Sequence, residues 1–190
     1  MSGRTFTVAN QITTLRLIFA PLFAILAISG HYSGALAVLA LAAASDVADG
    51  QIARRFHQKS SLGMVLDPTA DKLLMTTAYL VLSFGGALPW WLTIIVLTRD
   101  AGIVVTTLLI SLVSGYRPFP PTLLGKACTV AQVAALLAAV SERAHVDFVS
   151  PEVVLGFVYL AGALTVISGM HYLVIGRQRF DERSGDHSPV

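Results

Sequence analysis

Charged side chains are scarce in this sequence, and their scarcity excludes an ordinary soluble domain. Asp, Glu, Lys and Arg make up 13% of the 190 residues, whereas soluble domains carry about 25%. Hydrophobic residues account for 55% of the chain, and the mean hydropathy is +0.72. We therefore expect an integral membrane protein.

Cysteine is nearly absent as well, and the charge of the chain is close to balanced. The single cysteine, Cys128, excludes an internal disulfide and a metal site built from cysteines. A formal net charge of +2 is too small to indicate a nucleic acid partner. The remaining partners to consider are the lipid bilayer and small molecules.

Long apolar segments dominate what is present. A spanning helix needs about 20 mostly apolar residues, and six segments qualify: 12–29, 34–54, 70–88, 91–113, 123–140 and 153–175. The first is interpreted as a transmembrane helix and not a signal peptide, because its apolar run is long and further hydrophobic segments follow. The sequence therefore predicts an all-α, polytopic membrane protein with six transmembrane helices in one domain, residues 1–190, with a flexible tail over about 177–190.

Lysine and arginine fall on one side of this six-helix topology. The opposite side carries only Arg143, in the stretch SERAHVDFVSP. Because basic residues are enriched in cytoplasmic loops, we expect both termini to be cytoplasmic. We expect the protein to lie in the cell (inner) membrane.

Four aspartates lie within or beside the second and third segments, near the predicted cytoplasmic face. A charge at bilayer depth costs roughly 2.5–3.5 kcal/mol on insertion scales, so such residues are functional candidates. Asp46 and Asp49 are three residues apart and Asp67 and Asp71 four, so each pair shares one helix face. Since the intervening loop is short, we expect the two helices to be antiparallel neighbours and the four carboxylates to converge. An all-oxygen site of this kind suits Mg²⁺ or Mn²⁺.

Small residues accompany the aspartates. Gly50, Ala53 and Gly63 can serve close helix packing, or they can leave space for a ligand beside the metals. Taken alone they favour packing; together with the aspartates they favour the ligand.

The full pattern is Asp46-x-x-Asp49-Gly50-x-x-Ala53-Arg54, then eight residues, then Gly63-x-x-x-Asp67-x-x-x-Asp71. It resembles the signature of the CDP-alcohol phosphatidyltransferase family, with every signature position occupied. Asn10, Thr13 and Arg16 resemble the N-terminal element of that family. The resemblance implies six transmembrane helices, cytoplasmic termini and a homodimer.

The resemblance also implies an activity: transfer of a phosphatidyl group from CDP-diacylglycerol to an alcohol, with release of CMP. Two Mg²⁺ or Mn²⁺ ions would be held by Asp46, Asp49 and Asp67 with a contribution from Asp71, and Asp71 would act as general base on the acceptor hydroxyl. The implied donor-binding residues are Gly50, Ala53, Arg54, Gly63, Asn10 and Thr13.

The acceptor is indicated by basic residues farther along the chain. Arg99 and Asp100 inside the fourth segment can form an ion pair with each other or between helices, or Arg99 can bind a phosphate. Lys126 can extend its ammonium to the membrane interface, or it can join Arg99 and Arg117 in a pocket for an anionic acceptor, which we favour.

An anionic, glycerol-based acceptor is either phosphatidylglycerol, in the cardiolipin synthases, or glycerol 3-phosphate, in the phosphatidylglycerophosphate synthases. The Arg99–Asp100 pair and the stretch PTLLGKACTVAQ resemble the cardiolipin synthases. The other branch tends to carry Arg-Glu and a further arginine, which AGIVVTTLLISLVSG lacks. We therefore expect phosphatidylglycerol, with glycerol 3-phosphate as the alternative.

Two other classes also fit an acidic intramembrane site. Intramembrane prenyltransferases usually have two aspartate-rich motifs far apart, and this chain has one cluster. A cation transporter would use the aspartates as ion ligands but would leave Gly50, Ala53, Arg54 and Gly63 without a role.

Overall fold

The computed structural model describes the backbone of residues 8–56, 63–114 and 123–184, and the side chains of residues 17–45, 72–105 and 123–172. The described residues form six helices and no strand, which confirms the predicted all-α fold. The helices are α1 (Val8–Ile28), α2 (Tyr32–Phe56), α3 (Gly63–Phe84), α4 (Trp90–Ser114), α5 (Leu123–Arg143) and α6 (Pro151–Ser184).

Two helices extend well beyond the predicted apolar segments. Helix α3 begins at Gly63, seven residues before the segment 70–88, and α6 continues to Ser184, nine residues past the segment 153–175. Hydropathy locates the apolar stretch of a helix, whereas the helix itself continues through polar residues of high helix propensity, such as Arg177, Gln178 and Arg179. Residues 185–190 of the predicted tail lie outside the described part of the chain.

Helices α1, α3 and α5 end in the same way, at the same end of the bundle. After α1, the amide of Gly30 donates to the carbonyl of Ala27 and the amide of His31 to that of Leu26. This pattern is a Schellman motif, which needs a left-handed residue just past the helix. Gly30 (φ 77°) and Gly86 (φ 68°) supply it after α1 and α3, and His145 (φ 56°) supplies it after α5. These tight endings permit the short connections that return the chain into α2, α4 and α6.

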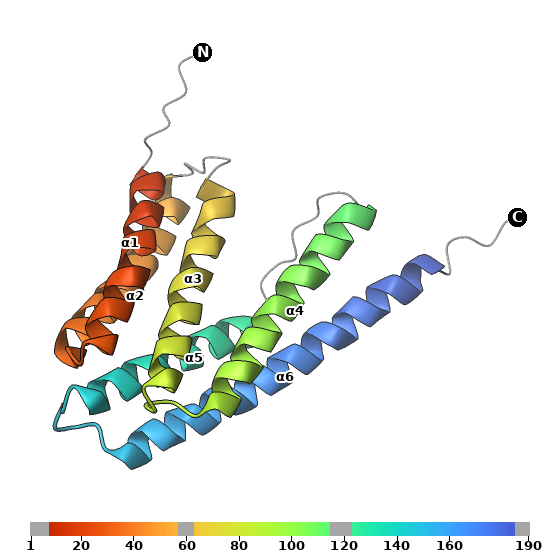
Figure 1. The fold of residues 1–190 in the computed structure, drawn as a ribbon. Coiled ribbons are helices and arrows are strands. Elements are labelled where there is room, and N and C mark those ends of the chain that lie inside the picture. The colour runs from red at the N-terminus through yellow and green to blue at the C-terminus, as the bar shows by residue number, and fades with distance from the viewer. Residues whose placement is uncertain (1–7, 57–62, 115–122, 185–190) are drawn as a thin grey trace, which may run out of the picture.

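Helix α5 joins two groups of helices. Figure 1 shows α1, α2 and α3 on one side and α4 with α6 on the other, and α5 contacts α2, α3 and α6. Small side chains on the buried surface of α5 allow this close approach: Ala131, Ala135, Ala138 and Ala139. The largest side chains in the core around them are Tyr79, Phe23, Leu82, Leu92 and Leu136, all fully buried.

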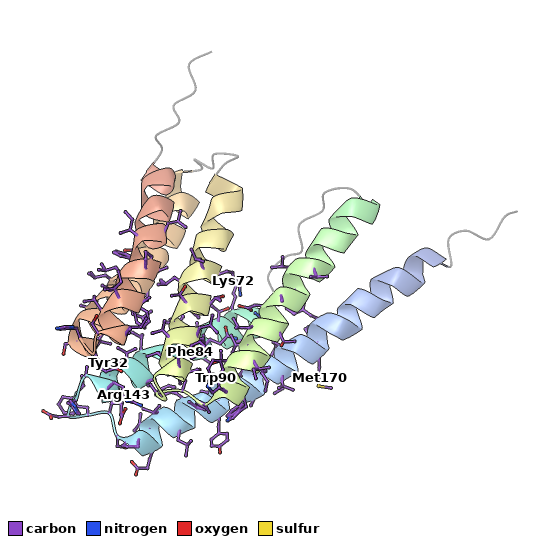
Figure 2. All side chains as sticks on the ribbon, viewed as in Figure 1. Tyr32, Lys72, Phe84, Trp90, Arg143 and Met170 are labelled. Atoms are coloured by element: carbon purple, nitrogen blue, oxygen red, sulfur yellow. The ribbon has the colours of Figure 1, made fainter. Side chains whose placement is uncertain are left out.

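Large apolar side chains are exposed on the outside of all six helices. Examples are Ile25 on α1, Leu41 on α2, Phe84 on α3, Ile94 on α4 and Val130 on α5; Figure 2 shows Met170 pointing outward from α6. A soluble surface rarely presents apolar groups so widely, whereas lipid requires it. The outer surface therefore indicates a membrane protein.

Two of the helices are long and apolar enough, over their described residues, to cross a membrane. These segments are Leu123–Arg143 and Pro151–Tyr172, while Leu17–Ile28, Tyr32–Ser45 and Lys72–Phe84 are shorter apolar stretches. The prediction of six spans is therefore not confirmed by this criterion.

Helices α4 and α6 cross where Gly162 faces an aromatic ring. A Cβ atom at Gly162 would lie 2.7 Å from the Cζ3 atom of Trp91, and the Trp91 ring stacks on Tyr159 with 5.9 Å between centroids. A distance of 2.7 Å is too short for carbon atoms that are not bonded. The two helices can therefore approach this closely only because Gly162 has no side chain.

We expect Gly162→Ala to destabilise the protein, because the added methyl must displace Trp91. Overpacking of this kind costs about 1–3 kcal/mol. The thermal midpoint of the purified protein in detergent should fall. Gly156→Ala is the matched control on the same helix, since nothing lies within 4 Å of its Cβ position. Equal midpoints for the two variants would contradict the tight crossing.

Candidate functional site

The backbone places the signature residues at one end of the bundle. Asp46 and Asp49 lie in the carboxyl-terminal half of α2, and Asp67 and Asp71 in the amino-terminal half of α3. Figure 1 shows the end of α2 and the start of α3 at the same end, beside the start of α1. The helical backbone confirms that each pair of aspartates shares one helix face.

The side chains of the signature lie outside the described residues. This holds for all the predicted metal and donor ligands: Asp46, Asp49, Asp67, Asp71, Gly50, Ala53, Arg54, Gly63, Asn10 and Thr13. The metal site therefore stays a prediction. The four carboxylates predicted to bind the metal lie on two helices, and carboxylate oxygens are the ligands that Mg²⁺ and Mn²⁺ prefer. Among the side chains that are described, no group of three or more His, Cys, Asp or Glu could hold a metal ion.

Helix α1 packs against both aspartate-bearing helices. The contacts of α1 with α2 and with α3 are extensive, and no contact between α2 and α3 is found among the residues whose packing is described. The predicted direct pairing of α2 with α3 is thus not seen in that part of the chain, where α1 bridges them. Helix α1, which carries Asn10 and Thr13, is thus the neighbour of both helices that carry the signature.

A buried ion pair lies on α4. Arg99 Nη1 donates to Asp100 Oδ1 at 2.9 Å, and the side chains are 7% and 11% exposed. Arg99 Nη2 donates to Ser168 Oγ on α6, also at 2.9 Å, and the guanidinium lies 5.9 Å from the centre of the Tyr172 ring. The mutual ion pair, one of the two interpretations of these residues, is therefore present.

Asp100 has a second cationic partner, on α3. Lys72 forms an ion pair through its ammonium with Asp100 Oδ2, and Figure 2 shows the Lys72 side chain projecting from α3 toward α4. One carboxylate is thus shared by two cations, so the group carries a net charge of +1. The Nε atom of Arg99 is buried without a hydrogen-bond partner. An excess positive charge and a free buried donor are features that favour an anionic ligand.

Of the other two residues predicted for the acceptor pocket, only Lys126 is described, and it is not part of this group. The described contacts of Arg99 go to Asp100, Ser168 and Tyr172, and Lys126 is not among them. Lys126 is exposed at the start of α5, and Arg117 lies outside the described residues. The predicted pocket of Arg99, Arg117 and Lys126 therefore stays a prediction.

Three members of the group were not singled out as functional from the sequence: Lys72, Ser168 and Tyr172. A signal for the last two was available, because Thr165, Ser168 and Tyr172 follow at positions i, i+3 and i+7, the spacing of one helix face. Lys72 could have been found as a cation next to Asp71 at the edge of an apolar run, where it needs a partner.

A second polar network lies deeper in the bundle. Gln132 Nε2 on α5 donates to Thr165 Oγ1 on α6 at 3.1 Å and to Cys128 Sγ at 3.4 Å, and Tyr79 on α3 donates its hydroxyl to the Gln132 carbonyl at 3.0 Å. Thr165 in turn donates to the Ala161 carbonyl at 2.6 Å. These hydrogen bonds connect α3, α5 and α6, and they account for the buried thiol of Cys128.

Comparison with known proteins identifies the family. The family model of CDP-alcohol phosphatidyltransferase matches residues 6–170. A Mycobacterium tuberculosis protein provisionally named a cardiolipin synthase is 40% identical over 128 residues, which cover 67% of this chain and 61% of that protein. A Streptomyces coelicolor protein named cardiolipin synthase (CMP-forming) is 39% identical over 134 residues, 67% of this chain and 62% of that protein.

A second M. tuberculosis protein, provisionally named a phosphatidylglycerophosphate synthase, is 35% identical over 178 residues, which cover 90% of this chain and 82% of that protein. The chain thus spans about three-fifths of the length of the first two relatives and most of the third. The match of the family model includes every position of the aspartate signature and both helices that carry it. The chain therefore belongs to the CDP-alcohol phosphatidyltransferase family.

Proposed function

We propose that the protein is a phospholipid-synthesising transferase that moves the phosphatidyl group of CDP-diacylglycerol to an anionic, glycerol-based acceptor and releases CMP. The observation that carries the proposal is the family match over residues 6–170, which contains the complete aspartate signature.

The proposed reaction assigns distinct tasks to the signature residues. The acceptor hydroxyl oxygen forms a bond to the phosphatidyl phosphorus, the bond from that phosphorus to the bridging oxygen of the pyrophosphate breaks, and CMP leaves with the bonding electrons. Asp71 takes the proton of the hydroxyl. Asp46, Asp49 and Asp67, with a contribution from Asp71, would hold two Mg²⁺ or Mn²⁺ ions, which would supply positive charge to offset that of the donor's phosphates. Gly50, Ala53 and Gly63 leave room for the nucleotide of the donor.

Phosphatidylglycerol is the acceptor that we favour, which makes the protein a cardiolipin synthase. Support comes from the names of the Mycobacterium and Streptomyces relatives and from the Arg99–Asp100 pair. Glycerol 3-phosphate is the second candidate, because the relative named as a phosphatidylglycerophosphate synthase aligns with 90% of this chain. Both acceptors carry a phosphate, and the net positive charge of Lys72, Asp100 and Arg99 suits either.

We further propose that all six helices span the membrane, with both termini and the aspartate site cytoplasmic, and that the protein forms a homodimer. Support for six spans comes from the exposed apolar side chains on every helix and from the excess of lysine and arginine on one side of the topology predicted from the sequence.

Asp67→Asn should abolish phosphatidyl transfer and weaken Mn²⁺ binding, because a neutral amide is a poorer ligand than a carboxylate for a hard cation. CMP release from CDP-diacylglycerol and Mn²⁺ titration followed by electron paramagnetic resonance measure the two effects. Asp147→Asn, an exposed aspartate in the loop between α5 and α6, is the control and should match the wild type. Wild-type activity in both Asp46→Asn and Asp67→Asn would overturn the metal assignment.

The purified protein should make cardiolipin from CDP-diacylglycerol and phosphatidylglycerol, and Arg99→Met should raise the KM for the acceptor. A lost charge-assisted hydrogen bond costs about 1.5–3 kcal/mol, which corresponds to roughly a tenfold to hundredfold higher KM. The substitution leaves Asp100 paired with Lys72, so the carboxylate is not stranded. Lipid products identified by mass spectrometry distinguish the acceptors: product from glycerol 3-phosphate alone would assign the protein to the alternative.

Membrane orientation can be tested with introduced cysteines, because the native Cys128 is buried. A membrane-impermeant maleimide should label Asp147→Cys from outside intact cells, and it should label Ser184→Cys, at the end of α6, only in inverted vesicles. Labelling of both sites from the same side would contradict the proposed topology.

A further inference from the structure

Lys72 links the predicted general base to the rest of the bundle. It follows Asp71 directly on α3, and its ammonium is paired with Asp100 on α4. Any displacement of Lys72 along or around the α3 axis therefore moves Asp71 as well, because the two residues are consecutive in one helix.

Asp100 is itself held in place. Its other carboxylate oxygen accepts from Arg99, and Arg99 is fixed to α6 by the Ser168 hydroxyl and the Tyr172 ring. The Arg99 side chain also lies beside Gly169 of α6, where a Cβ atom would be at an ordinary contact distance of 3.8 Å from the Arg99 Cγ. The contacts thus run without interruption from α3 through α4 to α6.

Only one other polar contact between α3 and α4 is found among the described side chains. The hydroxyls of Ser83 and Thr93 share a hydrogen bond of 2.5 Å near the connection between the two helices. Lys72 lies eleven residues before Ser83 on α3, which is about 16 Å along the helix. The short connection Gly85–Pro89 already joins the two helices beside the Ser83–Thr93 contact. The Lys72–Asp100 pair is therefore the polar contact that constrains the amino-terminal half of α3 relative to α4.

We infer that Asp100 is a positioning residue for the transfer reaction: by pairing with Lys72 it holds the amino-terminal half of α3, with Asp67 and Asp71, in one rotation against α4 and α6. The inference rests on the proposed function. An error of about 1 Å in the position of a catalytic group can cost about a hundredfold in rate. The pair itself adds little stability, because the Lys72 side chain is 39% exposed.

The test compares Lys72→Met, Asp100→Asn, the double variant and the conservative Lys72→Arg. Mn²⁺ affinity is measured by electron paramagnetic resonance without substrate, and kcat with CDP-diacylglycerol and phosphatidylglycerol. Lys72→Met and Asp100→Asn should each weaken Mn²⁺ binding or lower kcat by roughly tenfold to a hundredfold, as is typical when a group supporting a metal ligand is removed. The double variant should be no worse than either single one, and Lys72→Arg should retain most of both properties.

Thr93→Val is the matched control, because it removes the other polar contact between α3 and α4. It should lower the thermal midpoint and leave Mn²⁺ affinity unchanged. Wild-type Mn²⁺ affinity and kcat in both Lys72→Met and Asp100→Asn, or fully additive losses in the double variant, would overturn the positioning role. A wild-type protein that neither binds Mn²⁺ nor releases CMP would instead refute the proposed function, and the inference with it.

Discussion

The cost of placing charge among apolar helices is the constraint on which the organisation of this protein depends. Charge is scarce in the sequence, and the charged side chains that α4 buries are paired: Arg99 with Asp100, and Asp100 with Lys72 of α3. Removing one partner of the buried Arg99–Asp100 pair is strongly unfavourable, and the contact with Lys72 adds a constraint on orientation more than stability. The pairing therefore determines helix arrangement as well as local charge.

The same requirement applies to uncharged polar groups. Gln132, Thr165 and Tyr79 satisfy one another between α5, α6 and α3, and a partly satisfied network there would be worse than an apolar core. Small residues supply the complementary part of the arrangement. Gly162 admits the Trp91 ring between α4 and α6, and the alanines of α5 allow it to contact helices from both groups. Directional hydrogen bonds and close backbone approach together replace the hydrophobic driving force that lipid cannot provide.

The helices were predictable from the sequence because long apolar runs separated by Gly, Pro and polar residues have few alternatives to helical structure. Their ends were less predictable. In the first two turns of α3, Asp67 and Pro68 interrupt the apolar pattern, and in the last turns of α6 polar residues continue the helix. The Schellman ending at His145 was also invisible, because a non-glycine residue in the left-handed region depends on the fold around it. The shared faces of the aspartate pairs followed directly from their spacing and are confirmed by the helical backbone.

The partners of Arg99 were harder to predict, for a physical reason. Spacing along a chain defines which residues share one helix face, but Ser168 lies 69 residues away and meets Arg99 only because α4 and α6 pack together. The family resemblance rests on a signature confined to α2 and α3, whereas the group of Lys72, Asp100 and Arg99 depends on α3, α4 and α6 jointly. A short motif therefore identifies the family, whereas the charged group that we propose for the acceptor is assembled by contacts between distant helices that no local pattern encodes.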